Sequence, residues 1–262
     1  MERLGVVSAF AQLLGRLAAY SDAEMAQPWE WPGRKGAQLQ VRDCHWRIVE
    51  AEQAFLATAP AAEREAAAIM ELAQIAFGDL RGLLAGQTDD ALDAKPGDEW
   101  SLREVLSHVL MTERRYAWQV RYAVNRDATQ PTHAQPPVTV SAAETDSGIR
   151  DWIDVLEAER ARSDAYCGTL DAPALARPSV WMEYEIDVRF RLHRFAAHLE
   201  EHAIQAEKAL RAIDRTPSEA RQVVRVLSRL RGRHERRSSV GDQEHLDTAH
   251  LALAASLPPA RR

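Results

Sequence analysis

The placement of proline is the feature that most constrains this chain, because an α-helix tolerates proline only in its first turn. The prolines gather in a few short breaks, and between the breaks apolar residues recur at intervals of three and four, the helix period. No segment sustains the apolar–polar alternation of a half-buried strand. The sequence therefore predicts an all-α protein, with helices near residues 3–20, 40–58, 61–86, 101–124, 148–169, 184–213 and 217–232.

Two of these helices have recognisable start signals. Ser101 and Glu104 have the spacing of a capping box, in which a hydroxyl and a carboxylate each accept a hydrogen bond from a free backbone amide. Thr216 and Glu219 repeat this spacing, with Pro217 in the first helical position, where its missing N–H costs nothing. We therefore expect helices to begin at these two points.

Charge and cysteine content narrow the classes of function. A net charge of −6 argues against nucleic-acid binding through a broad basic face. No apolar run approaches about eighteen residues, so no membrane span is expected. The 2 cysteines are too few for a disulfide framework, which makes a reducing cytoplasm the expected compartment. The expected partners are small molecules, with no nucleic acid and no membrane.

Three connections share a loose pattern of aspartate, apolar residue, proline and tryptophan. They are Asp22–Trp31, Asp89–Trp100 and Asp171–Trp181, and each precedes a helix that contains an apolar–arginine pair. One interpretation is a repeated unit of helix, connection and helix, two copies of which would make a four-helix bundle. The other is that similar loops recur by chance between helices.

Histidines form the constellation that could carry chemistry. His198 and His202 lie one helical turn apart on an amphipathic helix, and Gln205 follows on the same face. Two imidazoles at this spacing can bind one transition metal, and His108, on the predicted helix that starts at Ser101, is a candidate third ligand. On residue patterns alone, the same histidines could instead be ordinary core residues.

Two longer motifs resemble a known family. The segment Trp100–His108, with Glu113 shortly after it, is similar to the second helix of the DinB-like family. The segment His198–Gln205 is similar to the fourth-helix motif of that family, H-x3-H-x2-Q. The resemblance implies a four-helix bundle that holds a divalent metal, with His108, His198 and His202 as ligands.

The match to the family pattern has departures. Glu201 stands where many members carry a second histidine immediately before the last ligand. A branch similar to mycothiol-dependent isomerases has glutamate where this chain has His198. The site is therefore nearer the plain DinB-like pattern, and the precise subfamily stays open.

The resemblance also implies a function and a cofactor. Assigned family members resemble thiol-dependent S-transferases, in which a divalent metal, zinc or nickel here, activates a low-molecular-weight thiol. This implies a metal-dependent transferase acting on a small-molecule substrate. A metal-dependent hydrolase is one alternative, and a non-catalytic helical scaffold or stress-associated binding protein is the other. Bundles of this type often pair, so a homodimer is an open alternative for the oligomeric state.

Three regions are expected along the chain. Residues 1–60 would form an N-terminal helical half-unit, and residues 61–214 the DinB-like metal-binding bundle. Residues 215–262 would form a basic C-terminal helix followed by a partly disordered tail. Because this helix has a narrow apolar stripe that includes Val223 and Leu227, we expect it to dock on the acidic body of the protein.

Several other residues are expected to be structural. Glu113 could be a general base or a partner that orients a histidine, but an ordinary surface acid is the favoured interpretation. Cys44 and Cys167 lack the context of a nucleophile and are predicted to be buried. His193 is predicted to lie on the solvated surface, and Trp100 is expected to wedge a loop against the bundle.

Overall fold

The computed structural model describes residues 8–33, 36, 38–58, 63–95, 97, 99–181 and 184–260, and it confirms the all-α prediction. The helices are α1 (Ala9–Ala18), α2 (Asp22–Met25), α3 (Val41–Thr58), α4 (Glu65–Leu84), η1 (Asp89–Ala91), α5 (Leu102–Asn125), α6 (Ala142–Thr145), α7 (Ile149–Cys167), α8 (Ala172–Leu175), α9 (Val188–Arg211), α10 (Glu219–His234) and α11 (Val240–Ala255). Within these ranges, β-structure is confined to two antiparallel hairpins, formed by β1 (Pro28–Glu30) with β2 (Gln38–Gln40) and β3 (Pro178–Trp181) with β4 (Tyr184–Asp187).

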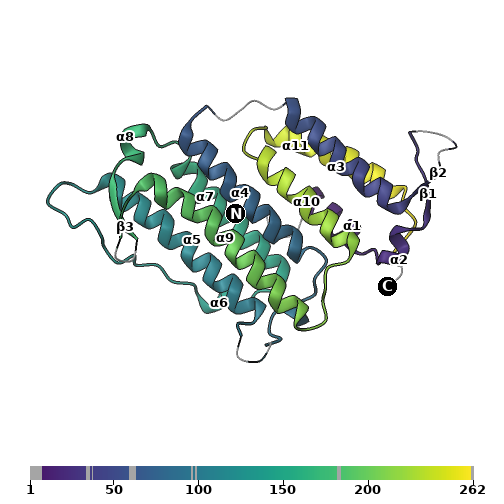
Figure 1. Cartoon of the computed structure of the whole chain (residues 1–262), viewed down its shortest axis with the longest axis horizontal. Helices are drawn as coiled ribbons and strands as arrows, with labels where there is room; N and C mark the ends of the chain where they lie inside the picture. Colours follow the sequence, from purple (N-terminus) through teal and green to yellow (C-terminus); the bar gives the residue numbers. More distant parts are fainter. Residues whose placement is uncertain are drawn as a thin grey trace.

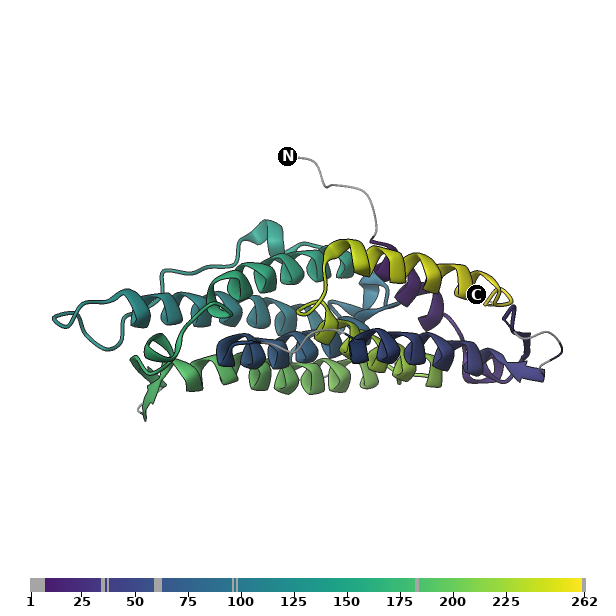
Figure 2. The ribbon, with the colours of Figure 1, turned by 90° about the horizontal axis from the view of Figure 1, so that it is seen from above.

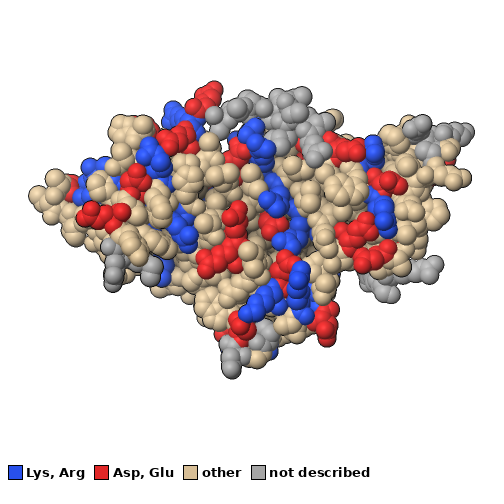
Figure 3. Space-filling model, viewed as in Figure 1, with Lys and Arg blue, Asp and Glu red and all other residues tan. Residues whose placement is uncertain are grey.

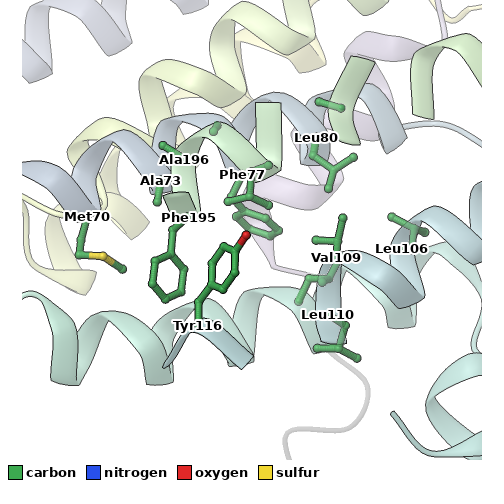
Figure 4. Packing of buried hydrophobic residues seen from close by; sticks show 14 of the residues in the cluster. Met70, Ala73, Phe77, Leu80, Leu106, Val109, Leu110, Tyr116, Phe195 and Ala196 are labelled. Carbon is green, nitrogen blue, oxygen red and sulfur yellow. The ribbon is translucent and has the colours of Figure 1, made fainter. Parts of the chain in front are cut away.

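Helices α4, α5, α7 and α9 form a four-helix bundle (Figure 1). In this bundle α9 packs on both α4 and α5, and α7 packs on the same two helices from the other side. The apolar stripes predicted by helix periodicity meet in one core, in which Phe77, Val109 and Phe195 are buried (Figure 4). The bundle therefore follows from the three- and four-residue spacing in the sequence.

A second group of four helices is assembled from both ends of the chain. Helices α1 and α3 pack with α10 and α11 and enclose a separate core that includes Leu17, Ile48 and Leu227 (Figure 2). Arg225 on α10 also forms ion pairs with Asp79 and Glu207 of the first bundle. Figure 3 shows basic and acidic side chains side by side on one face of the molecule.

Glycines bring the two bundles into close contact along α4 and α10. A Cβ added to Gly78 would lie 2.4 Å from the carbonyl oxygen of Ser228, and one added to Gly232 would lie 2.4 Å from that of Gln74. A Cβ on Gly82 would lie 2.8 Å from the Cα of Arg225. Because each helix offers a glycine to the backbone of the other, the contact is reciprocal. Only glycine permits backbones to approach this closely.

One of the two predicted helix starts is confirmed, and the other is displaced by two residues. Ser101 and Glu104 form the predicted capping box at the start of α5. The N-cap of α10 is Ser218, which accepts a hydrogen bond from the backbone amide of Arg221, and Thr216 lies outside the helix. The helix therefore begins two residues later than the Thr216–Glu219 spacing predicted.

The C-terminal region differs from the expected disordered tail, because α11 forms there and packs on α1 and α3. The buried residues of α11 include Asp247 and His250, which lie beside Arg231 and Glu52. A helix that buries polar side chains lacks the apolar stripe by which periodicity detects helices. None of the helices in the described ranges is both long and apolar enough to cross a membrane.

The first and third tryptophan connections share one local structure. Each consists of a four-residue helix, α2 or α8, and then a two-stranded hairpin that leads into a long helix. The backbone amide of Val41 donates to the carbonyl of Gln27 at 2.9 Å, and that of Val188 donates to the carbonyl of Arg177 at 3.0 Å. The second connection contains η1 instead.

The close approach of α4 and α10 yields a prediction. Gly78→Ala should destabilise the protein by roughly 1–3 kcal/mol, because the new methyl group would force the two backbones apart. Gly15→Ala is the control, since nothing lies within 4 Å of a Cβ at that position in α1. Denaturant unfolding measures both variants, and equal stability of the two would contradict the close contact.

Candidate metal centre

The three histidines singled out in the sequence lie together in the structure. One ring nitrogen from each of His108, His198 and His202 lies within 4.8 Å of one from each of the other two. The Nε2 atoms of His108 and His198 are 3.2 Å apart. The structure thus brings together residues that are far apart in the sequence, whereas their role as metal ligands stays a prediction.

Antiparallel packing of α5 on α9 produces this meeting. His108 lies near the start of α5 and faces the second half of α9, while Tyr116, further along α5, contacts Phe195 nearer the start of α9. His198 and His202 are one turn apart, and their ring centroids are 4.2 Å apart. Both are buried, and His108 is half-buried. The cluster therefore lies at the edge of the bundle.

Neighbouring side chains hold the rings in place. The Nδ1 of His202 is 2.7 Å from the Oε1 of Gln205, and because an amide oxygen can only accept, Nδ1 carries the proton. This leaves Nε2 of His202 free to bind a metal. Trp100 stacks parallel to His202 at 6.3 Å and lies 5.1 Å from His108, centroid to centroid. Trp100 therefore lies against the site itself, and its expected role in wedging a loop stays a prediction.

The residues that sequence reasoning missed are on the same helix faces as the ligands. The hydroxyl of Thr112 is 3.5 Å from the Nε2 of His108, and the ring of Tyr116 is 5.7 Å from that of His198. Thr112 and Tyr116 follow His108 at steps of four residues along α5. Helical spacing from His108 was the signal that could have found both.

Two of the imidazoles, those of His198 and His108, have lowered pKa values, which favours the neutral form that a metal ligand requires. Burial, followed by the neighbouring imidazoles and Arg194, lowers the pKa of His198 to about 3. Burial is also the main cause of the lowered pKa of His108, and His202 adds to it. The nitrogen lone pairs are therefore available at physiological pH.

The donor set fits a divalent transition metal. Two nitrogens bound to one tetrahedral zinc ion lie about 3.3 Å apart, close to the 3.2 Å between the Nε2 atoms of His108 and His198. Imidazole nitrogen suits zinc and nickel, and three protein ligands leave further coordination positions for other groups. Among the described residues, this is the only group of histidine, cysteine, aspartate or glutamate arranged to share an ion.

The cluster lies close to solvent. Trp100 is 40% exposed, and the half-buried His108 lies beneath it. Cavities of about 440 and 1040 Å³ lie elsewhere in the described structure, and neither is lined by a histidine of the cluster. The side of the cluster nearest to solvent is therefore the one that carries Trp100 and His108.

Glu113 is not the surface acid that the sequence favoured. It is 4% exposed, and it accepts a hydrogen bond from Arg160 at 2.7 Å. Arg160 also binds Asp164 at 2.8 Å. Glu113 follows His108 by five positions along α5, so its side chain points away from the histidine cluster and into the α5–α7 interface. Glu113 is therefore a buried structural carboxylate.

Sequence comparison identifies the family of the bundle. The DinB superfamily profile matches residues 73–206, a segment that runs from α4 through α9 and includes all three histidines. The chain belongs to the DinB superfamily. No curated protein matches the chain.

One solved structure resembles this DinB-superfamily chain. YfiT from Bacillus subtilis is described as a probable metal-dependent hydrolase with an unusual four-helix bundle topology. The two proteins are 15% identical, and the alignment covers 59% of this chain and 91% of YfiT, with a TM-score of 0.48.

The burial of Glu113 generates a prediction. Glu113→Gln should destabilise the protein by roughly 3 kcal/mol, because it removes a carboxylate from the buried guanidinium of Arg160. Glu50→Gln is the control, since Glu50 forms an exposed pair with Arg47 and should change stability by less than about 1 kcal/mol. Thermal or denaturant unfolding would measure both, and an unchanged Glu113→Gln variant would restore the surface interpretation.

Proposed function

We propose that this protein is a divalent-metal-dependent enzyme whose ion is held by His108, His198 and His202. The observation that carries the proposal is the convergence of three imidazoles, from two helices, at the edge of a DinB-superfamily bundle. The lowered pKa values of His198 and His108 support it, because protonated imidazoles cannot bind a metal. Zinc or nickel is the proposed ion, since nitrogen donors suit both.

The proposed reaction is transfer of a low-molecular-weight thiol to an electrophile. A divalent ion in such a site lowers the pKa of a bound thiol or water, so that a nucleophile is available at neutral pH. The protein has no thiol of its own for this role among its described residues. Cys44 and Cys167 are buried, and burial raises the pKa of each to about 12. The nucleophile must therefore come from outside the chain.

The side chains around the histidines have defined roles in this proposal. Gln205 holds the proton of His202 on Nδ1 and so directs Nε2 toward the other two imidazoles. Trp100 stacks on His202 and covers the cluster from the solvent side. Both residues fix ring orientation before any ligand arrives, which reduces the cost of binding.

Metal content tests the first part of the proposal. Purified protein should bind about one zinc or nickel ion per chain, and His108→Ala, His198→Ala and His202→Ala should each weaken binding by about tenfold or more. His193→Ala is the control, because His193 lies exposed on the same helix α9. Elemental analysis and competition with a chelator would measure the effect. Binding that survives unchanged in all three variants would refute the site.

Product analysis tests the second part. Metal-loaded protein incubated with thiols and electrophiles should form a product that carries the thiol sulfur, and the His198→Ala variant should not. Mass spectrometry identifies the product. A product that carries water instead would show a hydrolase and overturn thiol transfer. Stoichiometric metal with no product from any pair would favour the helical scaffold.

A further inference from the structure

Buried arginines in this protein normally bind two carboxylates each, and one of them binds none. The three that follow the rule are Arg81 with Glu157 and Glu235, Arg160 with Glu113 and Asp164, and Arg231 with Glu52 and Asp247. Arg191 is as deeply buried, at 1% exposure, yet it forms no ion pair with any carboxylate of the described ranges. A buried charge without a partner is costly, so the exception needs an explanation.

The contacts of Arg191 leave its charge uncompensated. It donates one hydrogen bond to the backbone carbonyl of Val180, and its guanidinium lies 5.5 Å from the ring centroid of Tyr116 and 5.0 Å from that of Trp181. Its Nε has no hydrogen-bond partner. Burial is the main cause that lowers the pKa of Arg191 to about 10; Tyr116 opposes this shift in part, and the charge of Arg194 adds to it. The surroundings of Arg191 therefore destabilise its charged form.

A second arginine adds to the imbalance. Arg194 lies on the same side of α9, and its guanidinium is 4.8 Å from the ring centroid of Trp181, the ring that Arg191 also contacts. Its Nε likewise has no partner. Its one ion pair, with the largely exposed Glu201, spans 3.9 Å, near the limit for such a contact. Both guanidinium groups thus contact the ring of Trp181. Among the described residues, the carboxylate of Glu201 is the only one that forms an ion pair with either of them.

This cationic pair lies beside the histidine centre. Arg194 precedes His198 by one helical turn, a rise of about 6 Å along α9. Tyr116 contacts both groups, because its ring lies beside His198 and beneath Arg191. A small molecule could therefore touch Arg194 and the histidines at the same time.

We infer that the substrate of the histidine centre carries an anionic group, a carboxylate, sulfonate or phosphate, which binds Arg194. Such a group supplies a counter-charge that the described residues do not provide to Arg191, through charge-assisted hydrogen bonds from the guanidinium of Arg194. Arg191 is too deeply buried to reach a ligand at the surface, so Arg194 is the residue that would bind the anion. The inference rests on the proposed function for the identity of the centre, but the anion subsite itself requires no metal.

Anion binding to the full chain tests the inference. Isothermal titration with methanesulfonate and with inorganic phosphate should detect binding to the wild type. Arg194→Gln should weaken it by about tenfold or more, and Arg194→Lys, which keeps the charge, by less. Arg189→Gln is the matched control, because Arg189 lies on the same helix but is already paired with Glu65 and Asp187. Absence of binding to the wild type, or equal binding to Arg194→Gln, would overturn the inference.

Two further measurements separate this inference from the proposed function. The His198→Ala variant should still bind methanesulfonate, even if it has lost its metal. Metal-loaded wild type should bind 2-mercaptoethanesulfonate more tightly than 2-mercaptoethanol, and Arg194→Gln should abolish that preference. A preference that persists in Arg194→Gln would refute the role of Arg194 while leaving the metal centre intact. Failure of metal binding alone, with methanesulfonate still bound, would refute the proposed function and leave the anion subsite.

Discussion

The antiparallel register of α5 against α9 determines which side chains meet at the edge of the bundle. This register places His108 opposite His198 and His202. It places Tyr116 opposite the part of α9 that precedes His198 and carries Arg191 and Arg194. A shift of one helix along the other by a single turn would separate the imidazoles and the aromatic–cation contacts together. The apolar packing of Phe195 against Tyr116 fixes this register, so hydrophobic burial and polar geometry have one cause.

Local patterns in the sequence were sufficient for part of this arrangement. The spacing of His198 and His202 follows from helix geometry, and Ser101 marks the start of α5 because capping depends on adjacent residues. Residue patterns made His108 only a candidate third ligand, and the family resemblance was needed to favour its meeting with the other two, since no local rule says which helices meet. Glu113 was misjudged for the same reason: its partner Arg160 lies on α7, far away in the sequence. Helix α11 escaped detection because its buried face includes Asp247 and His250.

The second bundle is also a group of four helices, but its core contains a different set of buried polar side chains. At its centre, Glu52 forms ion pairs with Arg231 and His234, and each of these three side chains is at most 2% exposed. Burial alone would raise the pKa of Glu52, but His234 and Arg231 hold it below its usual value. The cation in this core is thus a guanidinium supplied by the chain. The first bundle also buries guanidinium groups, but the group of three histidines at its edge includes no carboxylate and no guanidinium, and a metal ion from solution would supply the positive charge there.

The assembly of the second bundle from both ends of the chain has a consequence for biosynthesis. Helices α1 and α3 emerge from the ribosome long before α10 and α11, the helices that cover their apolar surfaces. The central bundle is continuous in sequence and can fold while synthesis proceeds, whereas α1 and α3 wait until α10 and α11 have been synthesised. The nascent chain therefore exposes the apolar faces of α1 and α3 throughout the synthesis of the central bundle.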